Sequence, residues 1–151
     1  MRIGYILGMK NGIHRFIFRE ICAMEEFGHE ILIFPLKMGE SLYEPREAWR
    51  LIPFSPLRVL LAQPFLALRR PRRYLGLLFC SLRTRSLVDF LFGGYYAYLA
   101  ERNGVQLLHA HFGDHKLYVG YYMKGFHDLP LVVTIHAHEL YANPNWRLFT
   151  R

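Results

Sequence analysis

The chain has 151 residues, 52% of them hydrophobic and 16% aromatic. A chain of this length can bury a sizeable core, so the composition indicates one globular domain and excludes an intrinsically disordered protein. The formal net charge is +7, but the basicity is local, because the stretch from Ala48 to Val88 holds eight arginines and no acidic residue. We therefore expect one surface that meets an anionic partner.

The cysteines and the hydropathy of the sequence predict the cellular location of the protein. Cys22 and Cys80 have no metal or redox spacing and lie in apolar surroundings, which is typical of small core residues in a reducing compartment. The N-terminus lacks the features of a signal peptide, and no uninterrupted apolar run reaches the roughly 18 residues of a spanning helix. We expect a cytoplasmic location, with peripheral contact to the inner face of a membrane as one option.

The first elements form a strand–helix–strand unit. Apolar runs predict strands over residues 2–7 and 30–36, the second weakened at its end by Pro35. Residues 15–27 between them have helical spacing, with Gly28 as the stop. Five apolar side chains are expected on one face of that helix: Phe16, Ile17, Ile21, Met24 and Phe27. Such units are right-handed and their strands are parallel.

A turn with two glycines, Gly8 and Gly12, leads into this helix. Its spacing is not G-x-G-x-x-G, and no acidic residue ends the second strand to hold a ribose, so a nicotinamide or flavin site is disfavoured. A glycine loop that feeds a helix N-terminus can still accept an anion or a sugar hydroxyl on its backbone N–H groups. His14 and Arg15 stand at that point. The alternative is an ordinary solvated loop.

Residues 57–86 form a basic insertion that follows a loop-like stretch. Leucine and phenylalanine alternate with arginine in it. Two amphipathic segments flank a hinge that contains Arg69, Arg70, Arg72 and Arg73. Segments of this kind lie on anionic lipid head groups, where each cation near the surface contributes about 1 kcal/mol. Two other interpretations remain: helices packed on the core with their arginines outward, and a nucleic-acid surface, which the high apolar content disfavours.

The rest of the chain continues the alternation of helices and strands. Helices are predicted over 87–102, bent near Gly93 and Gly94, and over 116–127. Strands are predicted over 105–109 and 131–135. The second of these is a β-branched run that is typical of a strand buried on both faces.

We therefore predict an α/β fold: a Rossmann-like doubly wound parallel sheet with a basic helical insertion, in a single domain over 1–151. A last helix starts at Asn143-Pro144 and the sequence stops at Arg151 within it, so we expect a truncated domain.

Histidines gather at the ends of two predicted strands. His109, His111 and His115 cluster at one end, and His136, Ala137, His138 and Glu139 end the other. Residues two apart on a strand share a face, and ligands bind at the carboxyl ends of parallel strands. These two tips therefore predict a binding site. The alternative is that each histidine only hydrogen-bonds a loop carbonyl.

A metal site is a further interpretation of the first cluster, because imidazole is the commonest ligand of zinc and a frequent ligand of iron. His109, His111, Asp114 and His115 come near the H-x-H-x-D-H pattern of metallo-β-lactamase-type hydrolases, with one residue too many before Asp114. That offset would turn the carboxylate elsewhere. No motif supports Ser/His/Asp or Cys/His catalysis.

Four segments carry a more specific signal. They are Arg2-Ile-Gly-Tyr-Ile-Leu; Phe16-Ile-Phe-Arg-Glu-Ile with Glu26-Phe-Gly-His-Glu-Ile; Leu108-His-Ala-His-Phe-Gly; and Leu131-Val-Val-Thr-Ile-His-Ala-His-Glu-Leu-Tyr. In this order and spacing they resemble the N-terminal half of a retaining glycosyltransferase of the GT-B fold, in the large family four. The resemblance is strongest to members that build bacterial exopolysaccharide and colanic-acid-type repeat units.

The resemblance implies an acceptor-binding domain, while a second Rossmann-like domain, not present in this sequence, binds the sugar nucleotide through a Glu-x7-Glu motif and an Arg/Lys pair. It implies that His136 is the catalytic-site residue that faces the reacting sugar. His111 and Gly113 would line the neighbouring strand end, and the loop of Gly8 and Gly12 would approach the donor phosphate and the acceptor.

Further site residues are expected beside these. His138 and Glu139 would shape the turn after His136, with Glu139 standing where Asp is common in the family. Family members often carry Ser-Glu-Thr where this chain has Ile13, His14 and Arg15. The added cations would suit an anionic or lipid-diphosphate acceptor.

We therefore expect a domain that binds a glycan or lipid-linked acceptor and works with a nucleotide-sugar donor as co-substrate, without a metal or another cofactor and without nucleic acid. An anionic membrane surface is a further expected partner. The domain alone is expected to be inactive. Two alternatives stay open: a non-catalytic remnant that binds a membrane or a partner, and a histidine-rich metal-dependent hydrolase.

Overall fold

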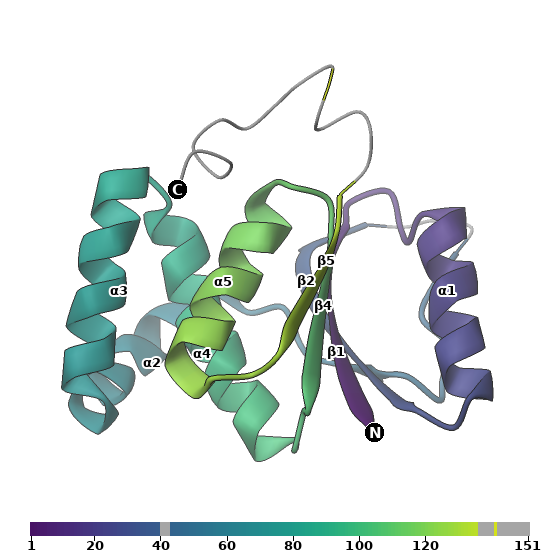
Figure 1. Cartoon of the computed structure of the whole chain (residues 1–151), viewed down its shortest axis with the longest axis horizontal. Helices are drawn as coiled ribbons and strands as arrows, with labels where there is room; N and C mark the ends of the chain where they lie inside the picture. Colours follow the sequence, from purple (N-terminus) through teal and green to yellow (C-terminus); the bar gives the residue numbers. More distant parts are fainter. Residues whose placement is uncertain (40–42, 136–140, 142–151) are drawn as a thin grey trace.

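The computed structural model describes residues 1–39, 43–135 and 141. Within them, five strands form one all-parallel sheet in the order β3-β2-β1-β4-β5. The strands are β1 (Arg2–Met9), β2 (Glu30–Met38), β3 (Arg50–Leu51), β4 (Leu107–His111) and β5 (Leu131–Thr134). Helices cover both faces (Figure 1). The predicted Rossmann-like, doubly wound α/β fold is therefore confirmed.

One face of the sheet is covered by α1 (Arg15–Glu26), which buries Ile17 and Ile21 on the side chains of β1 and β2. The predicted apolar face was too wide. Phe27 lies beyond the last helical residue and is 77% exposed, because the chain leaves the helical path there. Phe16 is 45% exposed in the first turn, where its ring meets those of His14 and Phe112.

The other face is covered by α4 (Leu87–Arg102) and α5 (His115–His127), which share a core rich in aromatic rings. The helix over 87–102 was expected to bend at its glycine pair, but it runs on as one element. The glycines instead allow α5 to approach: a Cβ on Gly93 would lie 2.5 Å from Cβ of Tyr122. On Gly94 it would lie 3.1 Å from the Phe126 ring.

Strand boundaries follow the pairing more than the apolar pattern. β4 begins at Leu107, where it starts to pair with β1, and it reaches His111, which pairs with Thr134 of β5. β2 continues past Pro35, whose carbonyl accepts a hydrogen bond from the Tyr96 hydroxyl. β5 was predicted to be buried on both faces, but among the described strands it stands at the edge, where Val132 is exposed and its other residues are only partly buried.

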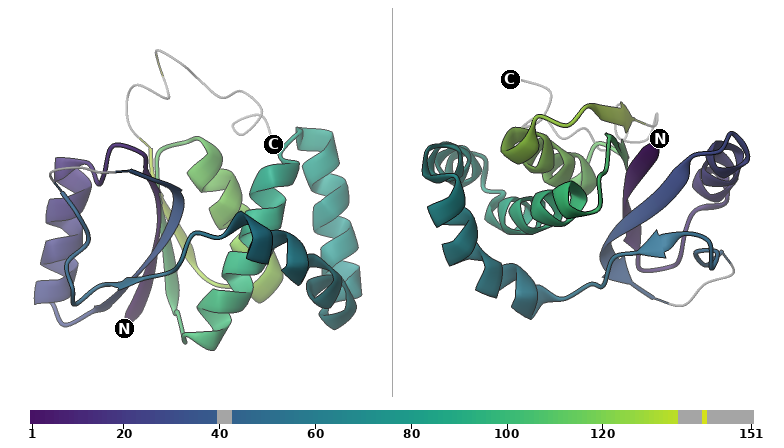
Figure 2. Two further views of the ribbon diagram at one scale, coloured as in Figure 1. Left: turned by 180° about the vertical axis from the view of Figure 1, so that it is seen from behind. Right: turned by 90° about the horizontal axis from the view of Figure 1, so that it is seen from below.

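The basic insertion forms two helices, α2 (Pro56–Arg69) and α3 (Pro71–Thr84), which pack outside α4 and α5 (Figure 2). The two predicted segments around an arginine hinge are therefore confirmed. The Ser55 side chain caps α2 by accepting from the backbone N–H of Arg58. No helix among the described residues is long and apolar enough to cross a membrane.

The close contact between α4 and α5 predicts opposite effects for two helical glycines. Gly93→Ala should lower the free energy of unfolding by about 1–3 kcal/mol, because the new methyl overlaps the Tyr122 side chain. Gly76→Ala on α3 should raise it by about 0.5–1 kcal/mol, since a Cβ there meets open space. Urea unfolding measures both; equal effects would contradict the packing described.

Candidate functional site

The carboxyl ends of β1 and β4 meet at one edge of the sheet, the upper edge in Figure 1. Both α1 and α5 begin at this edge, so two helix N-termini point at the same region. In open parallel sheets this is where ligands bind. The chain between β4 and α5 turns sharply there, since Phe112 has a φ of +74°, an uncommon conformation for a residue other than glycine.

A lysine lies over this edge. A Cβ built on Gly8 would lie 3.7 Å from Nζ of Lys116, so the ammonium group sits beside the end of β1. The same Nζ lies 4.7 Å from the centre of the Phe112 ring and pairs with the Asp114 carboxylate. Asp114 also caps α5 by accepting from the backbone N–H of Lys116. The lysine is therefore held in place on an aromatic platform.

The N-terminus of α1 lacks the cap that α5 has. His14 takes the cap position without a side-chain hydrogen bond, and the first turn contains no acidic residue. The positive end of the helix dipole is therefore left for a ligand, with the exposed Arg15 beside it. The His14 ring lies 5.4 Å from the Phe112 ring, so this helix start and the lysine share one aromatic platform.

Behind the edge, a carboxylate on α1 joins two histidines of β4. Oε1 of Glu20 lies 3.1 Å from Nδ1 of His109 and 3.3 Å from Nε2 of His111. The Tyr5 hydroxyl donates to the same oxygen over 3.3 Å, and Nε2 of His109 meets Oγ1 of Thr134 at 2.9 Å. The two imidazole rings stack with their centres 4.4 Å apart. The cluster ties α1 to three strands.

These contacts set the protonation of the cluster. Burial alone would raise the pKa of Glu20, but the hydrogen bonds from His109 and His111 outweigh it and hold that pKa well below its usual range. Burial, and then the Glu20 charge, raise the pKa of the Tyr5 hydroxyl. Glu20 is therefore ionised and Tyr5 neutral, so the tyrosine can act as a donor to the carboxylate.

The same cluster is the one set of described residues that could hold a metal ion. The ligand atoms of Glu20, His109 and His111 lie within 4.8 Å of one another, which suits a zinc-sized ion. The other two residues of the H-x-H-x-D-H-like pattern, Asp114 and His115, do not join this cluster. Asp114 caps α5, and Nδ1 of His115 lies 2.9 Å from the Asp89 carboxylate.

Two cavities lie beside the sheet, at opposite edges. One of about 340 Å³ is at the carboxyl edge and is lined by Met9, Gly12 and Gly39 among others. Another of about 230 Å³ is lined by Arg2, Glu30 and Asn103, at the edge where the strands begin. We take the first edge as the candidate site, because Lys116, Arg15, the open helix N-terminus and the strained turn lie there, whereas Arg2 at the other edge pairs with Glu30.

The structure brings several predicted site residues to this edge. Gly8 lies beside the lysine, Gly12 lines the carboxyl-edge cavity, and His14 and Arg15 form the start of α1. His111 is fully buried in the cluster with Glu20, and Gly113 is buried in the turn before α5. Three further predicted residues, His136, His138 and Glu139, lie outside the described residues.

Sequence reasoning missed Glu20 and Lys116. Glu20 follows the buried Ile17 at i+3 and precedes the buried Ile21, so its place on the sheet-facing side of α1 was a readable signal. The sequence contains no signal that marks Lys116 as a site residue, because only the fold brings it close to Gly8. The hinge arginines Arg69, Arg70 and Arg73 contact the ends of α4 and α5, and Arg72 is exposed.

Comparisons of the chain with protein-family models, with curated protein sequences and with solved structures found no match.

The charge of Glu20 predicts a pH-dependent effect. Glu20→Gln should lower the free energy of unfolding at about pH 7 by about 1–3 kcal/mol, because the charged hydrogen bonds are lost. A carboxyl with a lowered pKa makes its full contribution to stability above its unfolded value of 4.5, and this contribution is lost progressively as the pH falls from that value through the lower pKa of the folded state. The gap between variant and wild type should therefore be smaller at about pH 3 than at about pH 7.

Urea unfolding at both pH values measures this gap. Glu26→Gln is the matched control, because it makes the same change on an exposed residue of α1 and should alter the free energy of unfolding by less than about 0.5 kcal/mol. A gap that stays constant with pH, or equal losses in both variants, would refute the role of the Glu20 charge.

Proposed function

We propose that this chain is the acceptor-binding domain of a glycosyltransferase, which transfers a sugar from a nucleotide-sugar donor to a glycan or lipid-linked acceptor with retention of configuration. The main support is the meeting of Lys116, Gly8 and the open N-terminus of α1 at the carboxyl edge of the sheet. The order and spacing of the four segments that resemble family-four enzymes give the reaction class.

Each group at this edge has a role in the proposal. Backbone N–H groups at the start of α1, with Arg15 beside them, bind the anionic part of the acceptor. Lys116 adds a positive charge where the diphosphate of a donor or acceptor would approach, and Gly8 leaves the space for that approach. His14 and Phe112 offer ring faces for a sugar.

In this proposal Glu20, His109 and His111 do not contact the substrate but position the groups that do. They fix α1 against β4 and so set the distance between the start of α1 and the turn at Phe112. Such fixed positioning matters, because sugar transfer needs the acceptor hydroxyl held close to the reacting carbon. His136 remains the proposed residue that faces the reacting sugar.

A two-domain reaction predicts that the 151-residue chain alone transfers no sugar. The nucleotide-sugar site would be supplied by a second domain, so turnover should appear only when such a domain is joined to the C-terminal side. The measurement is transfer of labelled sugar to a lipid-diphosphate acceptor by both proteins. Turnover by the chain alone would contradict the proposal.

Two variants that each remove one lysine charge test the site within that two-domain enzyme. Lys116→Gln should lower kcat/KM by about ten- to a hundredfold, since one cation near the diphosphate is lost. Lys124→Gln is the matched control, because it removes the same charge from an exposed position in the last turn of α5. Equal activity of the two variants would place the diphosphate away from this edge.

A metal-dependent hydrolase is the second candidate, favoured by the trio of Glu20, His109 and His111. Its weakness is access: His111 is fully buried, whereas a catalytic metal keeps an open position for water and substrate. We predict less than about 0.1 equivalent of zinc or iron in the protein purified without chelator, measured by elemental analysis, because Glu20 and His109 are already hydrogen-bonded to Tyr5 and Thr134. One equivalent would favour the hydrolase.

A non-catalytic remnant is the third candidate. Coding sequence for a Glu-x7-Glu motif within about 150–200 residues downstream would speak against it, since that is the size of one further domain.

A further inference from the structure

The outer face of α2 is unusual for a surface helix, because it is apolar along its whole length. Its inner residues Val59 and Leu66 are buried against the core. The opposite side should then be polar, but Leu61 is 69% exposed and Leu68 is 84% exposed. The exposed residues of this side recur at helical spacing and contain no charge: Leu57, Leu60, Leu61, Pro64, Phe65 and Leu68.

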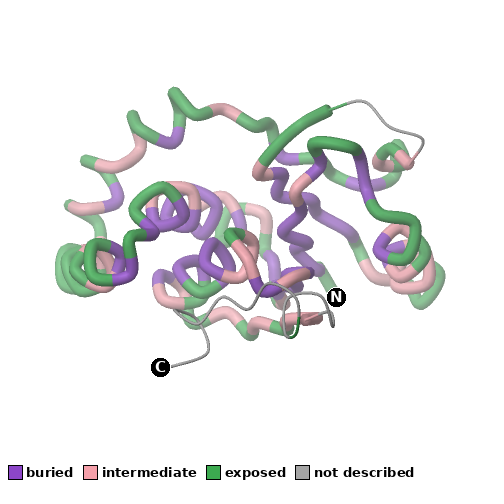
Figure 3. The backbone as a smooth tube through the Cα atoms, turned by 90° about the horizontal axis from the view of Figure 1, so that it is seen from above, coloured by how far each residue is buried: buried purple, intermediate pink, exposed green. Residues whose placement is uncertain are grey.

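The outer face of α3 continues this surface and adds cations to it. Leu75, Phe79 and Leu82 are exposed at spacings of four and three residues, which is one helix turn each. Arg72 and Arg83 are exposed on the same side, and the Arg83 guanidinium lies 5.8 Å from the centre of the Phe79 ring. We call the exposed sides of α2 and α3 together the hairpin surface; it lies at the end of the molecule away from α1 (Figure 3).

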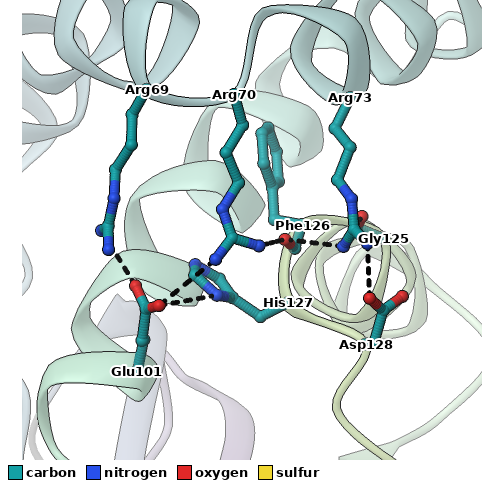
Figure 4. A network of polar contacts seen from close by, with 8 residues as sticks. All are labelled: Arg69, Arg70, Arg73, Glu101, Gly125, Phe126, His127 and Asp128. Carbon is teal, nitrogen blue, oxygen red and sulfur yellow. Dashed lines mark hydrogen bonds and ion pairs between the residues drawn. The ribbon is translucent and has the colours of Figure 1, made fainter.

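The arginines of the hinge do a different job. Arg69 and Arg70 both pair with Glu101 near the end of α4, at 2.9 and 3.3 Å. Arg70 and Arg73 also donate to the carbonyl oxygen of Phe126 in the last turn of α5, and Arg73 pairs with Asp128 (Figure 4). These three side chains turn towards the body of the protein.

This arginine clamp explains why the leucines face outward. It holds the point where α2 turns into α3 against the ends of α4 and α5, so the two helices cannot roll their apolar outer sides inward. Of the four hinge arginines, Arg72 alone has no ion pair or hydrogen bond among the described residues, and it lies on the outer side of α3. Three of the hinge arginines therefore hold the hinge against α4 and α5, and the fourth, Arg72, belongs to the exposed surface.

We propose that the hairpin surface docks on a lipid bilayer that contains anionic lipids, with the outer leucines in the acyl boundary and Arg72 and Arg83 at the head groups. An apolar surface this long is rare on a monomeric protein unless it binds something. The partner must also be negatively charged, because residues 48–88 contain arginine and no acid. An anionic bilayer meets both requirements.

Two other occupants fit less well. A second copy of the chain would bring two arginine-rich surfaces of like charge together. A nucleic acid would meet six apolar side chains on α2 where its phosphates need cations. The docking does not depend on the sugar-transfer proposal, since it rests on other residues and has a readout of its own.

Vesicle flotation of the 151-residue chain tests the docking. The chain should float with vesicles of phosphatidylcholine mixed with phosphatidylglycerol, and its partition coefficient should be at least about tenfold lower with phosphatidylcholine alone. The double variants Leu61→Glu with Leu68→Glu and Leu75→Glu with Phe79→Glu should each lower the partition coefficient at least about tenfold. Arg72→Gln should lower it about fivefold, the equivalent of roughly 1 kcal/mol.

Phe27→Glu is the matched control, because it places the same charge on a side chain that is 77% exposed at the end of α1, away from the hairpin surface. It should float as the wild type does, and circular dichroism should show that all variants are folded. Equal binding to both kinds of vesicle, or unchanged flotation of either double variant, would overturn the proposal. So would a dimer in solution that the same double variants abolish without any vesicle binding.

Discussion

The contact of the Glu20 carboxylate with His109 and His111 is the interaction on which the arrangement of the carboxyl edge depends. Among the helices that the structure describes, α1 is the one that covers its face of the sheet, and Ile17 and Ile21 are its buried side chains. Directional bonds to a partly buried charge fix the position of such a helix along the sheet more sharply than apolar packing does. The cluster therefore fixes where α1 begins, and with it the open helix N-terminus beside the lysine of α5.

Charge is used in two ways in this molecule. At Glu20 and in the arginine clamp, charged groups are partly buried and satisfied by the protein, so they set the positions of helices. At the carboxyl edge Arg15 is exposed to a ligand, and on α3 Arg72 and Arg83 are exposed. The sequence alone does not reveal this division, because an arginine that holds two helices together and an arginine that is exposed to a partner cannot be told apart without the fold. This division also separates the proposed sugar site from the proposed lipid-binding surface, because the two lie on different elements.

Much of the fold could be predicted, because strands, helices and their order follow from local apolar patterns. The pairing of His109 with His111 on one side of β4 also followed from the period of a strand. Features set by distant contacts could not be predicted. The glycine pair of α4 serves its close packing against α5, and β4 ends two residues later than predicted because His111 pairs with Thr134 of β5. Likewise, the sequence of residues 57–86 left contact with lipid and packing on the core as alternatives, and only the fold shows that α2 has apolar residues on both its buried and its exposed side.

The most direct test of this account is to locate the ligand on the molecule. An isotope-labelled sample of the chain can be titrated with a water-soluble alkyl-diphosphate sugar while backbone amide shifts are followed by NMR. The account predicts that the largest changes fall on the loop from Gly8 to Phe16 and on the turn from Phe112 to Lys116, the two segments that meet at the carboxyl edge. Changes centred on the opposite cavity around Arg2 and Asn103, or no changes at all, would contradict it.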